Sequence, residues 1–354
     1  MTTASPSTEP RVAGPAGPNA SAYERWMERT GAPIYQAYYI DDLRTLKLGR
    51  WDARGCDAAF LELAGQQGVT GAYVIEVGPG QTTEPFKVAI DECAYVLQGR
   101  GITTIESMDG SARRNFEWEA RSYFLLPGGH AYRISNVQGN QTARLLMCSH
   151  LPFVMSVLQK PAMFFNPPVL GPDDAFDGSG DYYSQAKTAP PAADSRASNL
   201  VGTLWRGNFF PDMGVWDQLA ALPTRGAGGR AIWIEFPSSH MTAHMSVFPP
   251  RMYKKGHRHG PGVFIVIPKG EGYSIMWPEG GEKVFVPWHE GSCFVPPMRW
   301  FHQHFNVNNI ANRYLAMLHC PRVMGNSETV EDRSRDQIEY PDEDPWVRET
   351  FAKE

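Results

Sequence analysis

Hydrophobic residues in this chain gather in short runs that glycine and proline separate. Between about residues 70 and 155 the runs are GAYVIEV, CAYVLQG, ITTIES, SYFLLPGG and ARLLMCS. The same texture returns between about 230 and 320, as AIWIEF, HMSVF, VFIVIPKG, YSIMW, CFVPP and RYLAMLH. Short runs rich in β-branched and aromatic residues, bounded by turn-forming residues, are typical of β-strands. The pattern therefore predicts two separate β-rich regions.

The rest of the chain is predicted to flank or connect these regions. Residues 1–20, rich in Pro, Ala, Ser and Gly, are expected to form a disordered tail because they offer little apolar surface to bury. Residues 21–69 are expected to form an N-terminal extension with a short helix that begins at Ser21. An irregular linker is predicted over 161–228 and a polar C-terminal tail over 323–354. The two β-rich domains then occupy 70–160 and 229–322.

The two β-rich regions repeat one set of spaced residues. In the second region the set is His259, Gly270, Pro297, His302 and Asn306. About 171 positions earlier, the first region has Val88, Gly99, Pro127, Tyr132 and Asn136 at matching intervals. A repeat of this kind indicates two homologous β modules.

These positions match the two sequence motifs of the cupin family. The C-terminal copy carries the motifs at Arg251, His257, His259, Val263 and Gly270, and at Gly291, Pro297, Arg299, His302 and Asn306. The N-terminal copy has Gly80, Phe86, Val88, Glu92 and Gly99, then Arg121, Pro127, Gly129, Tyr132 and Asn136. The chain therefore resembles a bicupin. That resemblance implies an all-β fold of two jelly-roll barrels, or double-stranded β-helices, with few short helices.

The two copies differ at the positions where cupins place their metal ligands. Phe86, Val88 and Tyr132 replace the histidines of the N-terminal copy, which keeps only Glu92. We expect that barrel to be metal-free and mainly structural, because one carboxylate does not hold a transition metal against water. The C-terminal copy keeps three histidines, which makes it the predicted metal-binding cupin.

The resemblance implies that His257, His259 and His302 bind the metal. Alternate residues of a strand point to the same side, so the imidazoles of His257 and His259 are expected to enter one cavity. The glutamate that usually accompanies them is replaced by Val263. Neutral imidazoles suit iron, zinc, copper or nickel, and three of them leave coordination positions open for reactants. A dianionic, bidentate substrate is favoured because the metal keeps its full charge.

The C-terminal motifs also resemble those of the gentisate, salicylate and 1-hydroxy-2-naphthoate dioxygenases, through HRH, GEGY and PP-x-x-W-x-H-x-H-x-N. Those enzymes use Fe(II) on three histidines to open a hydroxylated aromatic acid with O2. The likeness implies that His304, two residues after His302, has a catalytic role as a hydrogen-bonding or proton-transferring residue. The chain differs in carrying its histidines in the C-terminal copy and in having Gln303 between His302 and His304.

The leading hypothesis is therefore a mononuclear non-haem Fe(II) dioxygenase that cleaves or oxygenates a small hydroxylated aromatic or enolisable acid. One alternative is a non-oxidative lyase, decarboxylase, isomerase or hydrolase that uses Mn, Ni or Zn; copper is also compatible with the histidines. A second alternative is a non-catalytic binding cupin. The expected partners are a small-molecule substrate and O2, with association into a homodimer or a higher homo-oligomer.

Composition narrows the remaining function classes. The 354 residues carry a formal net charge of −5, with 20% charged residues, which disfavours nucleic-acid binding. No stretch approaches eighteen uninterrupted apolar residues and the N-terminus lacks a signal-peptide core, so membrane insertion and secretion are not expected. Five widely spaced cysteines do not suggest a disulfide framework. We therefore expect a cytoplasmic protein.

Overall fold

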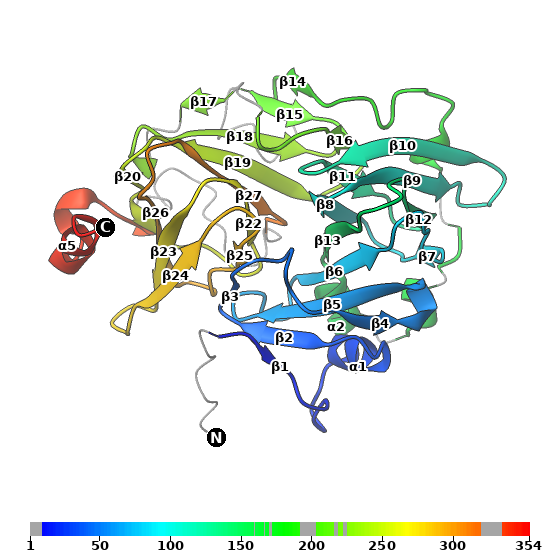
Figure 1. Ribbon diagram of the computed structural model, residues 1–354, viewed down its shortest axis with the longest axis horizontal. Coiled ribbons are helices and arrows are strands. Elements are labelled where there is room, and N and C mark those ends of the chain that lie inside the picture. The colour runs from blue at the N-terminus through cyan, green and yellow to red at the C-terminus, as the bar shows by residue number, and fades with distance from the viewer. Residues whose placement is uncertain are drawn as a thin grey trace.

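The chain forms two β-barrels that lie side by side, the N-terminal one on the right of Figure 1 and the C-terminal one on the left. This computed structural model describes residues 9–158, 160–165, 167–169, 172–191, 203–215, 219–221, 225–319 and 335–354. Each barrel consists of one large and one smaller sheet. The predicted all-β, two-barrel architecture with few short helices is confirmed.

The first barrel is formed by a large sheet and a four-stranded sheet. Its large sheet contains β1 (Arg11–Val12), β2 (Ile34–Ala37), β4 (Gly49–Trp51), β5 (Cys56–Leu63), β6 (Gly71–Val77), β8 (Glu92–Gln98), β11 (Tyr123–Leu126), β13 (Ala143–Ser149) and β16 (Phe209–Phe210). Its smaller sheet contains β7 (Phe86–Lys87), β9 (Arg100–Glu106), β10 (Arg113–Glu119) and β12 (Ala131–Asn136).

The second barrel has the same plan. Its large sheet contains β3 (Tyr39–Ile40), β14 (Lys187–Ala189), β15 (Leu204–Arg206), β17 (Ala220–Ala221), β18 (Arg230–Glu235), β19 (Thr242–Phe248), β22 (Phe264–Lys269), β25 (Cys293–Phe294) and β27 (Asn312–Met317). Its smaller sheet contains β20 (Met252–Tyr253), β21 (Gly256–His257), β23 (Gly272–Trp277), β24 (Val284–Trp288), β26 (Phe301–Asn306) and β28 (Gln337–Ile338). Every hydrophobic run that predicted a strand contributes to one of these two barrels.

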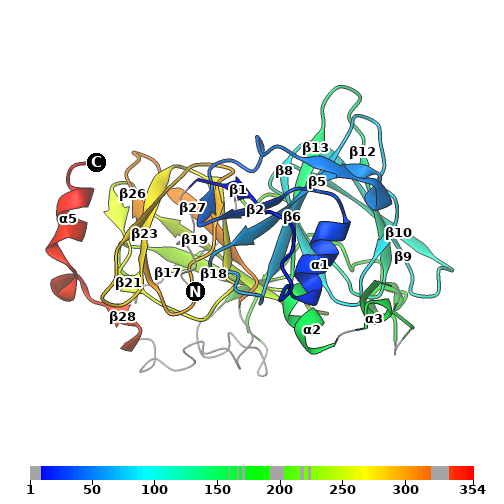
Figure 2. The ribbon, with the colours of Figure 1, turned by 90° about the horizontal axis from the view of Figure 1, so that it is seen from below.

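The helices in the described part of the chain are short and lie outside the barrels. They are α1 (Ala22–Arg29), α2 (Leu151–Val157), α3 (Ala162–Phe165) and α5 (Pro345–Phe351), with the 3-10 turns η1 (Asp52–Arg54), η2 (Asp174–Phe176) and η5 (Tyr340–Asp342). Ser21 caps α1 as predicted, because its hydroxyl accepts the backbone N–H of Glu24 at 3.1 Å. Figure 2 shows α1 and α2 beside the first barrel and α5 at the outer end of the second.

Segments predicted to be tails or linkers add strands to the barrels. Residues 34–63, within the predicted extension, form β2 to β5, and β3 pairs with β25 of the second barrel. The described part of the predicted linker forms β14 to β17, and β16 pairs with β11 of the first barrel. The connections therefore cross between the barrels. Their alternation signals are too short to identify from sequence, because most of these strands have only two to four residues.

The predicted tails are described only in part. Residues 1–8 and 323–334 lie outside the described residues. Residues 9–20, expected to be disordered, include β1, which pairs with β2. At the other end, residues 335–354 form β28 and α5, and β28 pairs with β21. This C-terminal segment is part of the second barrel.

The repeat deduced from sequence is visible in the backbone. Equivalent positions adopt the same left-handed conformation, although glycine and arginine exchange places there. The pairs and their φ angles are Gly80 (66°) and Arg251 (53°), Gly99 (87°) and Gly270 (100°), Arg121 (70°) and Gly291 (93°), and Gly129 (78°) and Arg299 (63°). A left-handed arginine costs free energy, and at Arg121 two hydrogen bonds to Asp212 offset that cost. Shared turns at a fixed offset confirm two homologous modules.

The repeated asparagines have one structural role in both barrels. Asn136 donates from Nδ2 to the carbonyls of Val77, Gly78 and Gln141. Asn306 donates in the same way to Phe248, Pro249 and Ile310. Each asparagine therefore joins two turns of its barrel by satisfying buried backbone carbonyls.

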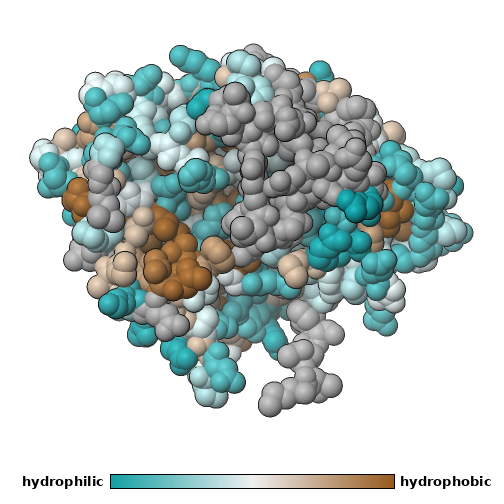
Figure 3. All heavy atoms as spheres, turned by 180° about the vertical axis from the view of Figure 1, so that it is seen from behind, coloured by the Kyte–Doolittle hydropathy of each residue, from teal (hydrophilic) through white to brown (hydrophobic). Residues whose placement is uncertain are grey.

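A continuous hydrophobic core joins the barrels through their large sheets. It includes Leu61 and Leu146 from the first barrel and Met245 and Leu315 from the second, all buried. The coloured part of the face seen in Figure 3 is mostly hydrophilic, with its largest hydrophobic area to the lower left of the centre. Among the helices described, none is long and apolar enough to cross a membrane.

Candidate metal centre

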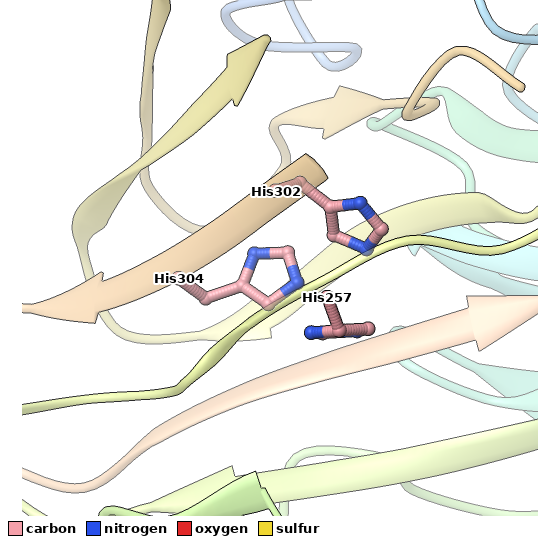
Figure 4. A group of neighbouring side chains, drawn as sticks. All are labelled: His257, His302 and His304. Atoms are coloured by element: carbon pink, nitrogen blue, oxygen red, sulfur yellow. The ribbon is translucent and has the colours of Figure 1, made fainter. Parts of the chain in front are cut away.

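Four histidines gather inside the second barrel. His257 ends β21, His259 follows in the next loop, and His302 and His304 lie on β26. Alternation along β26 turns the two latter side chains to the same face, and β21 pairs His257 directly with His302. Figure 4 shows the imidazoles of His257, His302 and His304 close together.

The distances define a tight group with one neighbour. One ring nitrogen from each of His257, His302 and His304 lies within 4.8 Å of the others. His259 stands beside this group, with its ring centre 4.7 Å from that of His302 and 6.1 Å from that of His257. The structure thus brings all four predicted site residues into one cluster, and its tightest set of ring nitrogens includes His304 in place of His259.

Hydrogen bonds orient three of the four rings. Nδ1 of His257 faces the carbonyl oxygen of Lys255 at 3.2 Å, that of His259 faces Gly260 at 2.7 Å, and that of His302 faces Trp300 at 3.3 Å. A carbonyl oxygen only accepts, so these Nδ1 atoms carry the proton and donate it. Each Nε2 then keeps a lone pair, which is the form that binds a metal.

His304 is held differently. Its Nδ1 lies 2.8 Å from the hydroxyl oxygen of Ser274, which also accepts the indole N–H of Trp288 at 3.0 Å. A hydroxyl both donates and accepts, so this contact allows either tautomer. His304 is therefore suited to transferring a proton as well as to binding a metal.

All four imidazoles are neutral at neutral pH. Burial, followed by the charge of Arg225 and by the neighbouring imidazoles, holds the pKa of His257 well below its usual value. Burial likewise depresses the pKa values of His302 and His304, and lowers that of His259 to about 4. Neutral rings are the state that metal binding requires.

The residues present fit a divalent transition metal. The group consists of imidazole nitrogens, and within the described chain no carboxylate joins it. Val263, at the position of the usual cupin glutamate, is buried in the hydrophobic interior of the barrel. An all-imidazole donor group suits Mn, Fe, Co, Ni, Cu or Zn better than calcium or magnesium, which prefer oxygen.

The C-terminal segment braces the strands that carry the histidines. Asp336 accepts hydrogen bonds from Arg258 at 3.0 Å and from Arg299 at 2.9 Å. Arg258 lies between His257 and His259, and the backbone N–H of Arg299 donates to the carbonyl of His259 at 3.0 Å. Sequence reasoning missed this brace, because residues 335–354 carry no motif and reach the site only through long-range pairing.

Lys254 is a residue that the sequence places near the motif, beside Arg251, Lys255 and Arg299, without assigning it a role. Its side chain is fully buried in the second barrel, where Nζ donates to the hydroxyls of Ser246 at 2.6 Å and Tyr314 at 3.1 Å. The ring centre of Tyr314 lies 4.9 Å from that of His304. The only sequence signal is a pair of adjacent lysines, and nothing in the pattern distinguishes the buried one.

The first barrel has a cation of its own at the corresponding place. The Arg54 guanidinium lies 4.4 Å from the ring centre of Phe86 and 5.0 Å from that of Tyr132, two of the replaced ligand positions. Glu92 accepts hydrogen bonds from Tyr73 at 2.9 Å and Tyr132 at 2.7 Å, as an internal carboxylate. Within the described chain, none of the guanidinium nitrogens of Arg54 has a hydrogen-bond partner.

Arg54 extends the internal repeat. It precedes Gly55, and Arg225 precedes Gly226 171 positions later; both glycines are left-handed, with φ of 63° and 70°. Arg225 lowers the pKa values of the four histidines, so its charge acts on the second barrel as that of Arg54 acts on the first. A search for the repeat upstream of residue 70 would have found this pair.

Comparison with known proteins supports the fold. No family model and no curated sequence matches the chain. Its structure resembles an oxalate decarboxylase from Lactobacillus farciminis, in a formate complex, with a TM-score of 0.50 and 13% identity over 80% of this chain and 86% of that one. The corresponding enzyme of Bacillus subtilis, studied for its Mn(II) centres, has a TM-score of 0.47 and 13% identity over 80% and 77%. At this identity the first likeness establishes the bicupin fold alone.

Proposed function

We propose that the second barrel is the active site of a divalent-metal enzyme that acts on a small carboxylic acid by a non-oxidative, lyase-type reaction. The observation that carries this proposal is the convergence of four imidazoles, three of them buried and that of His259 half-buried, and three of them fixed by backbone carbonyls with Nε2 available. A metal site with a purely structural role would not need a cluster of histidines like this one in the interior of a barrel.

His257, His259 and His302 would hold the metal through Nε2, and His304 would move a proton at the substrate. Bound there, the metal supplies Lewis-acid polarisation of substrate oxygens. The charges of Arg225 and Lys254 favour an anionic substrate and stabilise negative charge that develops as a carboxylate is lost. His304, hydrogen-bonded to Ser274, is placed to return a proton to that charge.

The lyase class is favoured over dioxygenation by the likeness of the fold to a decarboxylase, which is an argument by analogy. The dioxygenase remains a second candidate because Val263 replaces the carboxylate, as in the ring-cleaving dioxygenases that the motifs resemble. Turnover of a panel of dicarboxylic and hydroxylated aromatic acids, with and without O2, separates the two. Equal rates without O2 support the lyase, whereas strict dependence on O2 contradicts it.

Two variants test the assignment of the histidines. We expect His259→Gln to lose the metal, since it removes a ligand, and His304→Gln to keep the metal while turnover falls. The measurement is elemental analysis of each purified protein beside its rate. The reverse result would instead make His257, His302 and His304, the tightest group, the ligands.

A further inference from the structure

The ammonium group of Lys254 is buried without an opposite charge. Its side chain has no exposed surface, and Nζ contacts only the neutral hydroxyls of Ser246 and Tyr314. Within the described chain no carboxylate lies within salt-bridge distance of it. The aromatic faces of Tyr314 and Phe248, 4.6 and 5.4 Å from Nζ, offset only part of the cost of burying the charge.

The cluster of Lys254, Ser246 and Tyr314 exists only in the barrel that carries the histidines. Ser246 and Tyr314 pair directly across β19 and β27. In the first barrel the equivalent pair, across β6 and β13, is Ile75 and Leu145, and Thr83 takes the place of Lys254. The two barrels share their turns and their asparagines, so a buried lysine with two hydroxyls is a feature of the candidate site and not of the fold.

The position of Lys254 ties it to the histidines. Its backbone N–H donates to the carbonyl of His304 at 3.0 Å, and Tyr314 lies between its ammonium group and the imidazole of His304. An ammonium group has three N–H donors, and the two hydroxyls take two of them. One donor remains for a further acceptor.

We propose that Lys254, assisted by Tyr314, binds a carboxylate group of the substrate, so that the substrate is an acid with two anionic groups, one facing the histidines and one facing Lys254. This inference rests on the proposed function and deepens it. A carboxylate supplies both the missing acceptor and the missing negative charge. A neutral residue in place of Lys254 would remove the preference for a substrate with a second carboxylate, and would leave every histidine in place.

The test compares Lys254→Met and Tyr314→Phe with the wild type, and uses Lys255→Met as the matched control. Lys255 is the next residue, but its ammonium group is paired with Glu339 away from the histidines. Calorimetry with Mn(II)-loaded protein measures the binding of oxalate, malonate and succinate, with acetate as the single-carboxylate reference. We expect Lys254→Met to weaken the best dicarboxylate by about 30-fold or more, Tyr314→Phe to weaken it less, and acetate and Mn(II) affinities to stay unchanged.

Thermal unfolding of the metal-free protein gives a readout that does not depend on the metal. The best dicarboxylate should raise the unfolding temperature of the wild type and of Lys255→Met, but not that of Lys254→Met. Without any dicarboxylate, Lys254→Met should unfold at a temperature no lower than that of the wild type. Equal dicarboxylate binding by wild type and Lys254→Met would overturn the inference. If the protein bound no metal but a dicarboxylate still stabilised it in a way that required Lys254, the inference on Lys254 would be supported. The proposed function would then be contradicted.

Discussion

The two barrels place different chemistry at equivalent positions. Where the second has His257, His259 and His302, the first has Phe86, Val88 and Tyr132, and the guanidinium of Arg54 lies against two of these rings. The first barrel thus contains a cation that belongs to the chain, next to the buried Glu92. The second contains neutral imidazoles that could bind a metal cation. The same scaffold thus places a guanidinium against aromatic rings in one barrel and a cluster of imidazoles, with Arg225 and Lys254 as its cations, in the other.

The largest expected effect comes from the ligand positions themselves. We expect His302→Ala to lose bound metal and all turnover, because it removes a donor from the centre of the cluster. Tyr132→Phe, at the equivalent position of the first barrel, should keep both. Metal analysis and rates of the two variants check this. If His302→Ala kept its metal, or Tyr132→Phe lost it, the contrast between the barrels would fail.

A double-mutant cycle tests the built-in cation of the first barrel. Arg54 and Glu92 are both buried and each charge acts on the other, so Arg54→Met and Glu92→Gln should each destabilise the protein, by about 0.5–3 kcal/mol. The double variant should lose clearly less than the sum, because neither charge is then left uncompensated. Urea unfolding measures all three, and additive losses would mean that Arg54 does not compensate Glu92.

The brace on the second barrel should matter for metal affinity more than for folding. Asp336→Asn weakens the hydrogen bonds to Arg258 and Arg299, and because Asp336 bonds to these arginines and not to an imidazole, metal affinity should fall by less than the roughly 10–100-fold that direct partners of ligand histidines typically give. Asp344→Asn is the control, because Asp344 caps α5 and pairs with Lys283 in the same segment without contacting the histidine strands. Competition titration with a chelator should separate the two variants, and equal affinities would argue against the brace.

The smallest predicted effect is a difference in pH dependence between the barrels. His302 has a folded pKa well below 6.5, so the unfolded chain binds the extra proton and stability falls as pH drops below that value, by about 1.4 kcal/mol per pH unit for each such histidine. Burial raises the folded pKa of Glu92 above 4.5. The stability that protonated Glu92 contributes is therefore lost as pH rises from 4.5 through the folded pKa.

Two variants of the metal-free protein make these opposite signs measurable. Unfolding by urea from pH 4.5 to 7 should show a shallower loss on acidification for His302→Gln than for the wild type. Glu92→Gln should show a steeper loss, because the opposing contribution has gone. The same slope in all three proteins would mean that neither group is perturbed as described.

Much of the fold could be predicted because hydrophobic runs and turn residues repeat at a fixed offset. Each run, from GAYVIEV to RYLAMLH, became a strand, and the shared Asn136 and Asn306 have identical roles. Strands of two residues, such as β3 and β16, could not be found, since their pairing depends on partners far away in the chain. Tertiary structure alone decides such pairs.

The candidate site was predicted as far as its motif residues extend. Strand alternation spaces His302 and His304, whereas His259 lies in a loop after β21, and the structure brings His259 beside the other three histidines. The role of Lys254 and the position of Asp336 could not be predicted, because side-chain direction in a loop and the docking of a distant segment are set by packing. Arg54 could have been found, because its partner Arg225 stands at the offset of the repeat.

The most direct test of the contrast is a crystal structure of the protein purified with its native metal, with diffraction data collected on both sides of that metal's absorption edge. We expect one anomalous peak, among His257, His302 and their neighbouring histidines in the second barrel, and none beside Arg54 in the first. An anomalous peak in the first barrel, or a metal-saturated protein without a peak at the histidines, would contradict it.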